Sequence, residues 1–242
     1  MKKKLINLIF RKRLFIAVSK GIEKNVRKVV PNVLDIILTP FITILSSGLI
    51  SLFIIGPLGR LVGTGISSML GLVLGKGGII AGLGFGGLYS SIVITGVHHS
   101  FHAFEAEMIK NLGGNYLLPI WAMSNVAQGG AALGAFFKTK NSKIKAIALP
   151  ASLSCLLGIT EAAIFGVNLR LVKPFIGAAI GGALGGAFVV FMKVYMTGVG
   201  VTGIPGIAIV ANGSLLYYMI GMIIAFGGAF ISTWILGVKE SE

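Results

Sequence analysis

The chain has 242 residues, of which 55% are hydrophobic and only 12% are charged, and its formal net charge is +14. Soluble domains are about one-quarter charged, so this composition excludes a soluble enzyme with one buried core, and it also excludes a disordered chain. The single cysteine, Cys155, excludes an internal disulfide and a cysteine-rich zinc site. We therefore expect an all-α polytopic membrane protein.

The N-terminal segment, residues 1–30, is a basic arm that holds ten of the 21 lysines and arginines, and only Glu23 opposes them. Such a run can bind nucleic acid, but here it leads directly into an apolar segment. We interpret it as a cytoplasmic or interfacial arm that lies on anionic lipid, and we expect no nucleic-acid partner.

Several segments after the arm are apolar and long enough to cross a bilayer, and these are residues 33–55, 78–97, 117–137, 174–195 and 213–237. In two of them small residues recur every four positions. This spacing predicts close helix packing through Gly82 and Gly86 in the first case, and through Gly181 and Gly185 in the second.

The topology depends on three further segments. Residues 59–75 form a weak span or an interfacial segment, and residues 196–212 form a loop or a re-entrant segment. Residues 138–145 carry four lysines and no acid, so we place them on the cytoplasmic side with the basic arm. An even number of crossings must then separate these two basic segments, so either residues 59–75 cross the bilayer or one segment is re-entrant.

The polar stretch 98–116 holds all three histidines. On a helix, His98, His102 and Glu105 would share one face. Two imidazoles and a carboxylate suit zinc or iron, so one alternative is a metal-ion transporter that uses His98, His99 and His102, although the H-E-x-x-H pattern is absent. Histidines here are also compatible with a pH-sensitive site, or with a solvated connection that has no function of its own.

Glu161 is the one acidic residue of the apolar segment 146–168, which is interrupted by Pro150 and by a Gly-Ile-Thr-Glu sequence. An interrupted apolar segment is a common sequence sign of a transporter's binding site. An ionisable group at membrane depth is costly and by default marks a functional site. The alternative is a structural ion pair between Glu161 and Arg170 or Lys173.

The glycines near Glu161, Gly158 and Gly166, can open the backbone around it. A carboxylate at a helix break can accept hydrogen bonds from two neighbouring hydroxyls, which suits a neutral, hydroxyl-rich sugar. His98 or His99 could supply the complementary donor or acceptor. Aromatic side chains could offer an apolar face to a sugar ring, and the candidates are Phe101, Phe104, Trp121 and Phe165.

Four ordered blocks of the chain resemble one family. The sequence Gly158–Glu161 with the eight residues after it resembles the G-I-T-E signature of enzyme IIC, the membrane component of bacterial phosphotransferase-system (PTS) sugar permeases of the glucose superfamily. The segment Thr95–Phe101 is similar to that family's histidine-pair segment, and the blocks Val30–Phe41 and Ile55–Gly59 match two further family blocks. The resemblance runs from about residue 20 to the end of the chain.

The resemblance implies a partial EIIC transporter fold with re-entrant hairpins, which translocates a sugar across the bacterial cytoplasmic membrane. The phosphate for the sugar comes through soluble IIA and IIB domains. The implied partners are therefore these domains, the sugar, the lipid bilayer and a second copy of the chain in a homodimer, whereas neither a cofactor nor a metal is implied. The residues that follow Glu161 are most similar to the sucrose-specific branch, with trehalose and β-glucoside permeases next.

The same resemblance assigns roles to individual residues. Glu161 is implied to be the catalytic residue, which orients the sugar hydroxyl or deprotonates it as a general base. Thr160 and Glu161, together with a histidine of the His98-His99 pair, are implied to bind the sugar.

The match begins partway through the family's membrane domain. We therefore expect a truncated or split permease, with an EIIC-like domain over residues 31–238 and a tail over 239–242. Cys155 lies in an apolar run and is expected to be a small buried residue rather than the phosphorylated cysteine of a IIB domain. The chain alone is then not expected to phosphorylate sugar, and an inactive permease fragment is the remaining alternative.

Overall fold

The structure is a computed structural model, and it describes residues 22–28, 30–31, 34–50, 53, 77–96, 98 and 101–238. The chain divides into two compact units, which are residues 1–67 with 95–97, and residues 68–94 with 98–242. Most of the basic arm, residues 59–75, His99 and the tail 239–242 lie outside the described residues. The predictions about these parts of the chain therefore stay predictions.

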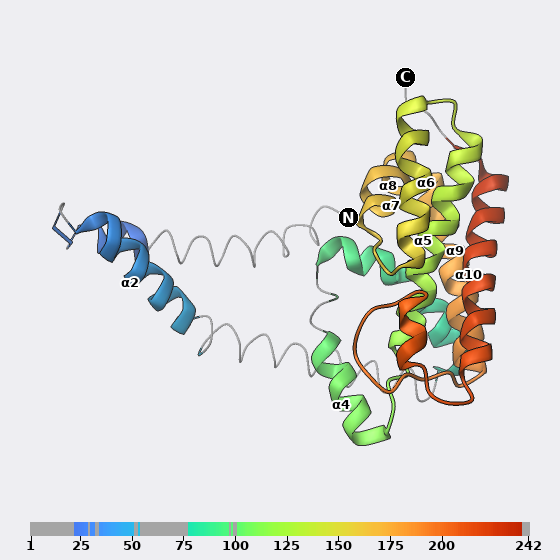
Figure 1. Ribbon diagram of the computed structural model, residues 1–242, viewed down its shortest axis with the longest axis horizontal. Coiled ribbons are helices and arrows are strands. Elements are labelled where there is room, and N and C mark those ends of the chain that lie inside the picture. Colours follow the sequence, from blue (N-terminus) through green and yellow to red (C-terminus); the bar gives the residue numbers. More distant parts are fainter. Residues whose placement is uncertain are drawn as a thin grey trace. The chain divides into compact units, whose positions relative to one another are not determined.

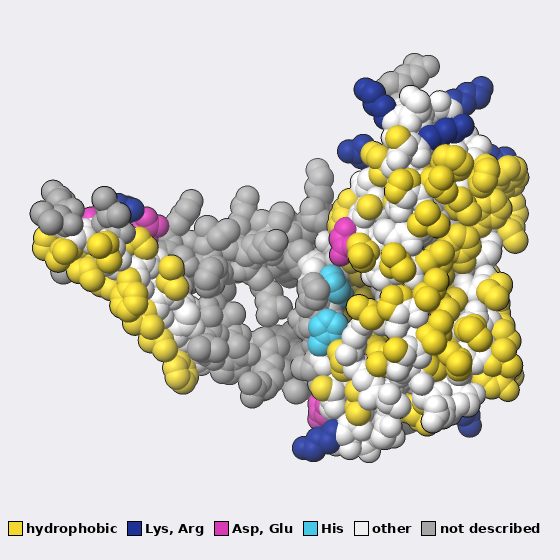
Figure 2. Space-filling view, viewed as in Figure 1, with side chains coloured by type: hydrophobic (Ala, Val, Ile, Leu, Met, Phe, Trp, Pro, Cys, Tyr) yellow, Lys and Arg dark blue, Asp and Glu magenta, His cyan; other side chains and the backbone are white. Residues whose placement is uncertain are grey.

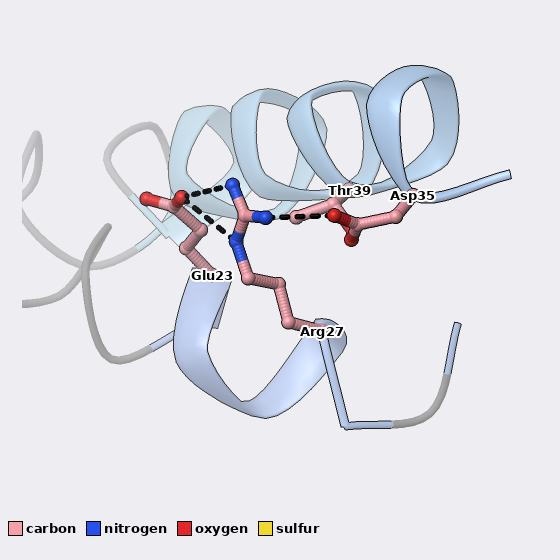
Figure 3. A network of polar contacts seen from close by, with 4 residues as sticks. All are labelled: Glu23, Arg27, Asp35 and Thr39. Atoms are coloured by element: carbon pink, nitrogen blue, oxygen red, sulfur yellow. Dashed lines mark hydrogen bonds and ion pairs between the residues drawn. The ribbon is translucent and has the colours of Figure 1, made fainter. Parts of the chain in front are cut away.

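In the first unit, the first predicted span forms helix α2, Asp35–Ile50. Its 16 residues extend about 24 Å, which is less than the ~30 Å thickness of a hydrocarbon core. Arg27 lies before α2 and donates to Glu23 at 2.9 Å and to Asp35 at 2.7 Å. Asp35 also accepts a hydrogen bond from the Thr39 hydroxyl at 2.6 Å (Figure 3). These contacts join the turn around Arg27 to the first turn of α2.

The second unit is a bundle of long helices that lie side by side (Figure 1). The long helices are Gly77–Thr95, α5 (Leu118–Lys138), α6 (Ser142–Leu156), α9 (Lys173–Phe191) and α10 (Leu215–Leu236). Helix α5 packs against α6, α9 and α10, and 17 of its 21 residues are buried. The core of this unit therefore runs along α5.

Within the described part of the chain, three helices are long and apolar enough to cross a membrane, namely Gly77–Thr95, α9 and α10. They coincide with three of the predicted spans. Helix α5 forms where another span was predicted, but it is more polar than these three helices because it carries Ser124, Asn125 and Gln128. These polar side chains are enclosed by protein. Figure 2 shows hydrophobic side chains over the outside of this unit and Lys and Arg side chains at its two ends. The chain is an all-α polytopic membrane protein, as predicted.

Glycines allow the helices of this unit to approach closely, as their spacing predicted. A Cβ atom on Gly182 of α9 would lie 2.6 Å from the carbonyl oxygen of Gly86. On another face of α9, a Cβ atom on Gly181 would lie 2.5 Å from the amide nitrogen of Ala229 in α10. Helix α9 therefore contacts two neighbouring helices through two faces of small residues, which is how helices pack closely in membranes.

Helix α6 runs through Pro150, so the interruption predicted at this proline was wrong. A proline removes one backbone donor from a helix, and here buried side chains of α6 such as Ala151 and Cys155 pack in a core cluster with Ala132 and Ala135 of α5. This packing holds the helix on both sides of the proline. Cys155 is fully buried, as predicted.

The interruption predicted after α6 is present at Gly158, which takes a left-handed backbone conformation with φ +85°. The chain then continues through three short helical segments, which are α7 (Glu161–Ala163), the π-helix η3 (Ile164–Asn168) and α8 (Leu169–Leu171). Gly166 lies inside η3 with a negative φ, so Gly158 alone of the two glycines opens the backbone.

Two segments complete the unit. Within the polar stretch 98–116, for which a solvated connection was one of the alternatives, the chain forms helix α4 (His102–Leu112) and ends it at Gly113, with φ +72°. Residues 196–212 form a loop, as one of the two predictions for them proposed. The loop contains a 3-10 turn, η4 (Pro205–Ile209), and is joined to residue 115 and to itself by isolated β-bridges at Met196.

Candidate functional site

The second unit contains a cavity of about 190 Å³. It lies among the helix Gly77–Thr95, α4, α5, the interruption after α6 and the loop 196–212. The lining residues are Tyr89, Val93, His98, His102, Glu105, Leu118, Trp121, Asn125, Gly158, Thr160, Glu161, Gly200, Val201 and Thr202. A water molecule needs about 10–15 Å³ by a comparable measure, so the cavity has room for a ligand much larger than water.

The Gly158–Glu161 segment reaches the cavity because its backbone packs directly against the neighbouring loop. A Cβ atom on Gly158 would lie 2.7 Å from the carbonyl oxygen of Thr202. Ile204 donates its amide to the carbonyl of Leu156 at 2.7 Å, and the Ser154 hydroxyl donates to the carbonyl of Ile159 at 2.8 Å. The interrupted segment is thus held at both its start and its middle.

Thr160 and Glu161 both line the cavity, as the prediction of a sugar-binding pair requires. Thr160 is buried, whereas Glu161 is exposed and begins α7. Within the described residues Glu161 makes no ion pair, and Lys173, one of its two suggested partners, donates to the carbonyl of Leu236 at 2.8 Å. The structural ion pair considered for Glu161 is therefore absent from this part of the chain. The π-helix follows at once, and such helices often occur at functional sites.

The histidines divide into three cases. His98 lines the cavity, and its ring lies edge-on to that of Tyr89 with 6.4 Å between the centroids. His99 lies outside the described residues. His102 lines the cavity together with Glu105. The three side chains therefore line one space, but the single helix face predicted for them was wrong, because α4 begins at His102 and His98 precedes it. Figure 2 shows histidine side chains at the surface of this unit, with an acidic side chain on the same face.

Glu105 is a buried carboxylate in the cavity wall. Its Oε2 lies 3.1 Å from Nδ1 of His102, and its Oε1 has no hydrogen-bond partner among the described residues. Burial raises the pKa of Glu105, and hydrogen bonding to His102 and to Trp121 opposes this rise without cancelling it. Glu105 was predicted only as a possible metal ligand, and its burial was not predicted.

Several lining residues were missed, and two of them, Asn125 and Thr202, form a polar pair. Asn125 of α5 donates its side-chain amide to the hydroxyl of Thr202 at 2.8 Å, and both side chains are buried. Asn125 could have been noticed as a polar residue within a predicted span, by the reasoning applied to Glu161. Thr202 lies in a polar loop, where a threonine gives no signal of its own.

Of the four aromatic candidates, one lines the cavity. Trp121 lines the cavity and stacks on Tyr89 with 4.2 Å between the ring centroids. Phe101 packs against Trp121 at 5.6 Å, and Phe165 is half exposed; neither these two nor Phe104 lines the cavity. Trp121 is therefore the one predicted aromatic residue that faces the candidate ligand space.

The metal-transport alternative gains no support from the geometry. Among the residues that the structure describes, no group of three or more His, Cys, Asp or Glu side chains is arranged to hold a metal ion. His102 and Glu105 form a pair rather than a three-ligand site, and His99 lies outside the described part.

Comparison with known proteins identifies a family and relatives that match most of the chain. Residues 14–182 match the model of the family "Phosphotransferase system, EIIC". The chain is 62% identical over 220 residues to the "PTS system sucrose-specific EIIBC component" of Salmonella typhimurium, a match that covers 90% of this chain and 48% of the relative. The protein of the same description from Klebsiella pneumoniae is 63% identical over 207 residues, which is 85% of this chain and 45% of the relative.

A relative from Bacillus subtilis carries the same description. The "PTS system sucrose-specific EIIBC component" of Bacillus subtilis is 55% identical over 232 residues, which is 95% of this chain and 50% of the relative. The chain thus spans about half the length of the curated relatives it matches. No solved structure matches it.

Proposed function

The chain belongs to the EIIC family of the phosphotransferase system, and on this basis we propose that it forms the sugar-translocating part of a phosphotransferase permease. The sugar enters through this membrane domain and is phosphorylated by a IIB domain that receives its phosphate from IIA. The relatives described as sucrose-specific favour a sucrose-like disaccharide as the substrate, with trehalose or a β-glucoside next. The domain acts in the bacterial cytoplasmic membrane as a homodimer.

One observation carries this proposal more than any other. Glu161 lacks an ion-pair partner within the described residues, and it lines one cavity together with the buried Thr160 and with His98. An ionised carboxylate makes strong hydrogen bonds to hydroxyl donors, and a histidine ring can donate or accept depending on its tautomer. A neutral molecule rich in hydroxyls satisfies both kinds of group without bringing a charge into the membrane domain.

The carboxylate also has a role in phosphorylation. The sugar hydroxyl attacks the phosphorus of the phosphocysteine on IIB, so that an oxygen–phosphorus bond forms and the sulfur–phosphorus bond breaks. Glu161 takes the hydroxyl proton, and the cysteine leaves as a thiolate. Thr160 and His98, or the neighbouring His99, hold the sugar so that this hydroxyl faces the phosphate.

Sugar binding to the full chain in lipid nanodiscs, measured by isothermal titration calorimetry, tests the proposal. We expect sucrose to bind, and Glu161→Gln to weaken binding at least about tenfold, which is the effect of losing one hydrogen bond to a charged group. Glu107→Gln is the matched control, because Glu107 is an exposed residue of α4 outside the cavity lining. If sucrose, trehalose and a β-glucoside all fail to bind, or if Glu161→Gln leaves binding unchanged, the proposal is wrong.

The same samples separate the metal-transport alternative. Zinc titrated in place of sugar is expected to give no saturable heat. Zinc binding that is lost in His102→Ala, together with no sugar binding, would favour a metal-ion transporter. Membranes that also contain the IIB and IIA domains and a phosphate donor test the second step, with formation of sugar phosphate as the readout.

A further inference from the structure

His102 and Glu105 form a pair in the wall of the cavity, and the proposed function assigns no role to this pair. His102 is the first residue of α4 and Glu105 lies three residues later, so their side chains lie on the same face of that helix. Oε2 of Glu105 is 3.1 Å from Nδ1 of His102. The His102 side chain is 51% exposed, whereas that of Glu105 is fully buried. Both residues therefore line the cavity, but only the His102 side chain is accessible.

The burial of Glu105 is costly for folding. A carboxylate removed from water loses its hydration, and hydrogen bonding to His102 and Trp121 replaces only part of it. Its second oxygen, Oε1, makes no hydrogen bond within the described residues. A surface ion pair between the same two residues would have joined them at little cost. The position of Glu105 is thus better explained by what it does to the histidine than by a contribution to stability.

A carboxylate that contacts one ring nitrogen determines how the histidine is used. With Nδ1 directed at Glu105, the ring turns its Nε2 edge away from that carboxylate. The hydrogen bond between Nδ1 and Glu105 then determines which of the two ring nitrogens carries the proton. Metal-binding and catalytic histidines are oriented by carboxylates in this way. A ring nitrogen can donate to a hydroxyl or accept from one, depending on the tautomer, so the oriented edge is suited to a hydroxyl of the ligand.

We propose that His102 binds the sugar in this cavity and that Glu105 is its positioning residue. The inference rests on the proposed function, and it adds a second polar wall to the site. Glu161 and Thr160 come from the interruption after α6, whereas His102 and Glu105 come from α4. A disaccharide carries hydroxyls on two rings, so contacts from two separate elements fit it better than they fit a smaller ligand.

Binding measurements on the full chain in nanodiscs test the proposal through a double-mutant cycle. His102→Ala is expected to weaken sucrose binding about tenfold, and Glu105→Gln to weaken it by a similar or smaller factor. Since Glu105 acts through His102, Glu105→Gln has no further effect on affinity in a chain that already carries His102→Ala. Independent, multiplying effects of the two substitutions would overturn the positioning role.

A spectroscopic readout distinguishes positioning from a purely structural role. With ¹⁵N-labelled histidine, the ring nitrogen signals of His102 are identified by their loss in His102→Ala. Glu105→Gln is expected to shift these signals, because it changes the hydrogen bond at Nδ1, while Glu107→Gln leaves them in place. If Glu105→Gln does not fold, Glu105→Asp replaces it: the carboxylate is retained but set back by one methylene, so the same shift and weaker binding are expected.

The outcomes separate this inference from the proposed function. If sucrose binds and Glu161→Gln weakens it while His102→Ala does not, the inference fails and the proposed function stands. If the unaltered chain binds no sugar, the proposed function fails, and the assignment of His102 to a sugar fails with it.

Discussion

The α-carbon of Gly158 lies against the backbone of Thr202, so close that a Cβ atom on the glycine would be 2.7 Å from the carbonyl oxygen of the threonine. The interruption after α6 and the loop 196–212 therefore meet without a side chain between them. This contact sets the position of Thr160 and Glu161, which follow Gly158 directly, at the cavity. The geometry of the site therefore depends on Gly158, which has no side chain, as much as on the polar groups that line the cavity.

Gly158→Ala is expected to lower stability and to weaken sugar binding. The φ of +85° alone costs an alanine about 1–3 kcal/mol, and the contact with Thr202 adds to this cost. Thermal unfolding of the full chain in detergent measures the first effect and calorimetry the second. Gly227→Ala in α10 is the matched control, since a Cβ atom there meets nothing within 4 Å, and it should leave binding unchanged.

Gly86→Leu is expected to loosen the contact between the helix Gly77–Thr95 and α9. The added side chain would run into the backbone of Gly182, and overpacking of this kind costs about 1–3 kcal/mol. Gly84→Leu places the same side chain two residues earlier, at an exposed position with open space around it. The unfolding temperature should fall for the first variant only. Equal losses in both would mean that close helix contact is not what Gly86 provides.

Most of the helices could be predicted because a long apolar run needs no knowledge of its neighbours. This is why Gly77–Thr95, α9 and α10 coincide with predicted spans. The surroundings of α5 could not be predicted in the same way, because hydropathy does not say whether lipid or protein covers a helix. Pro150 was misjudged for a related reason, since the packing of α6 against α5 outweighs the lost hydrogen bond of one proline.

The site was predicted where a single residue contrasts with its local sequence. Glu161 stands out as a carboxylate in an apolar run, and His98 as part of a histidine pair at the end of a span. Thr202 could not be found, because its partner Asn125 lies 77 residues away and only the fold brings them together. The burial of Glu105 was likewise beyond prediction, since it depends on how α4 lies against the bundle and not on the residues around it in sequence.

The hydrogen bond from Asn125 to Thr202 is expected to join α5 to the loop 196–212 energetically. Asn125→Ala removes the donor and leaves the buried Thr202 hydroxyl without this partner, and Thr202→Val removes the acceptor of the buried Asn125 amide. Each should therefore destabilise the chain by about 1–3 kcal/mol. The double variant should be less damaging than the sum, with a coupling of about 1 kcal/mol. Denaturant unfolding of the four proteins measures the coupling, and strict additivity would show that the contact contributes nothing.

The raised pKa of Glu105 predicts a pH dependence of stability with a definite sign. In the folded chain the carboxyl group keeps its proton to higher pH than in the unfolded chain, because it is buried. The folded state then binds more protons than the unfolded state over this window, so stability falls as pH rises from the ordinary range of a glutamate through the raised pKa. Glu105→Gln carries no titrating group at this position. Measured against pH, the unfolding free energy of the unaltered chain should therefore fall relative to that of the variant, and a difference that stays constant or rises with pH would contradict the burial of an acidic group at this position.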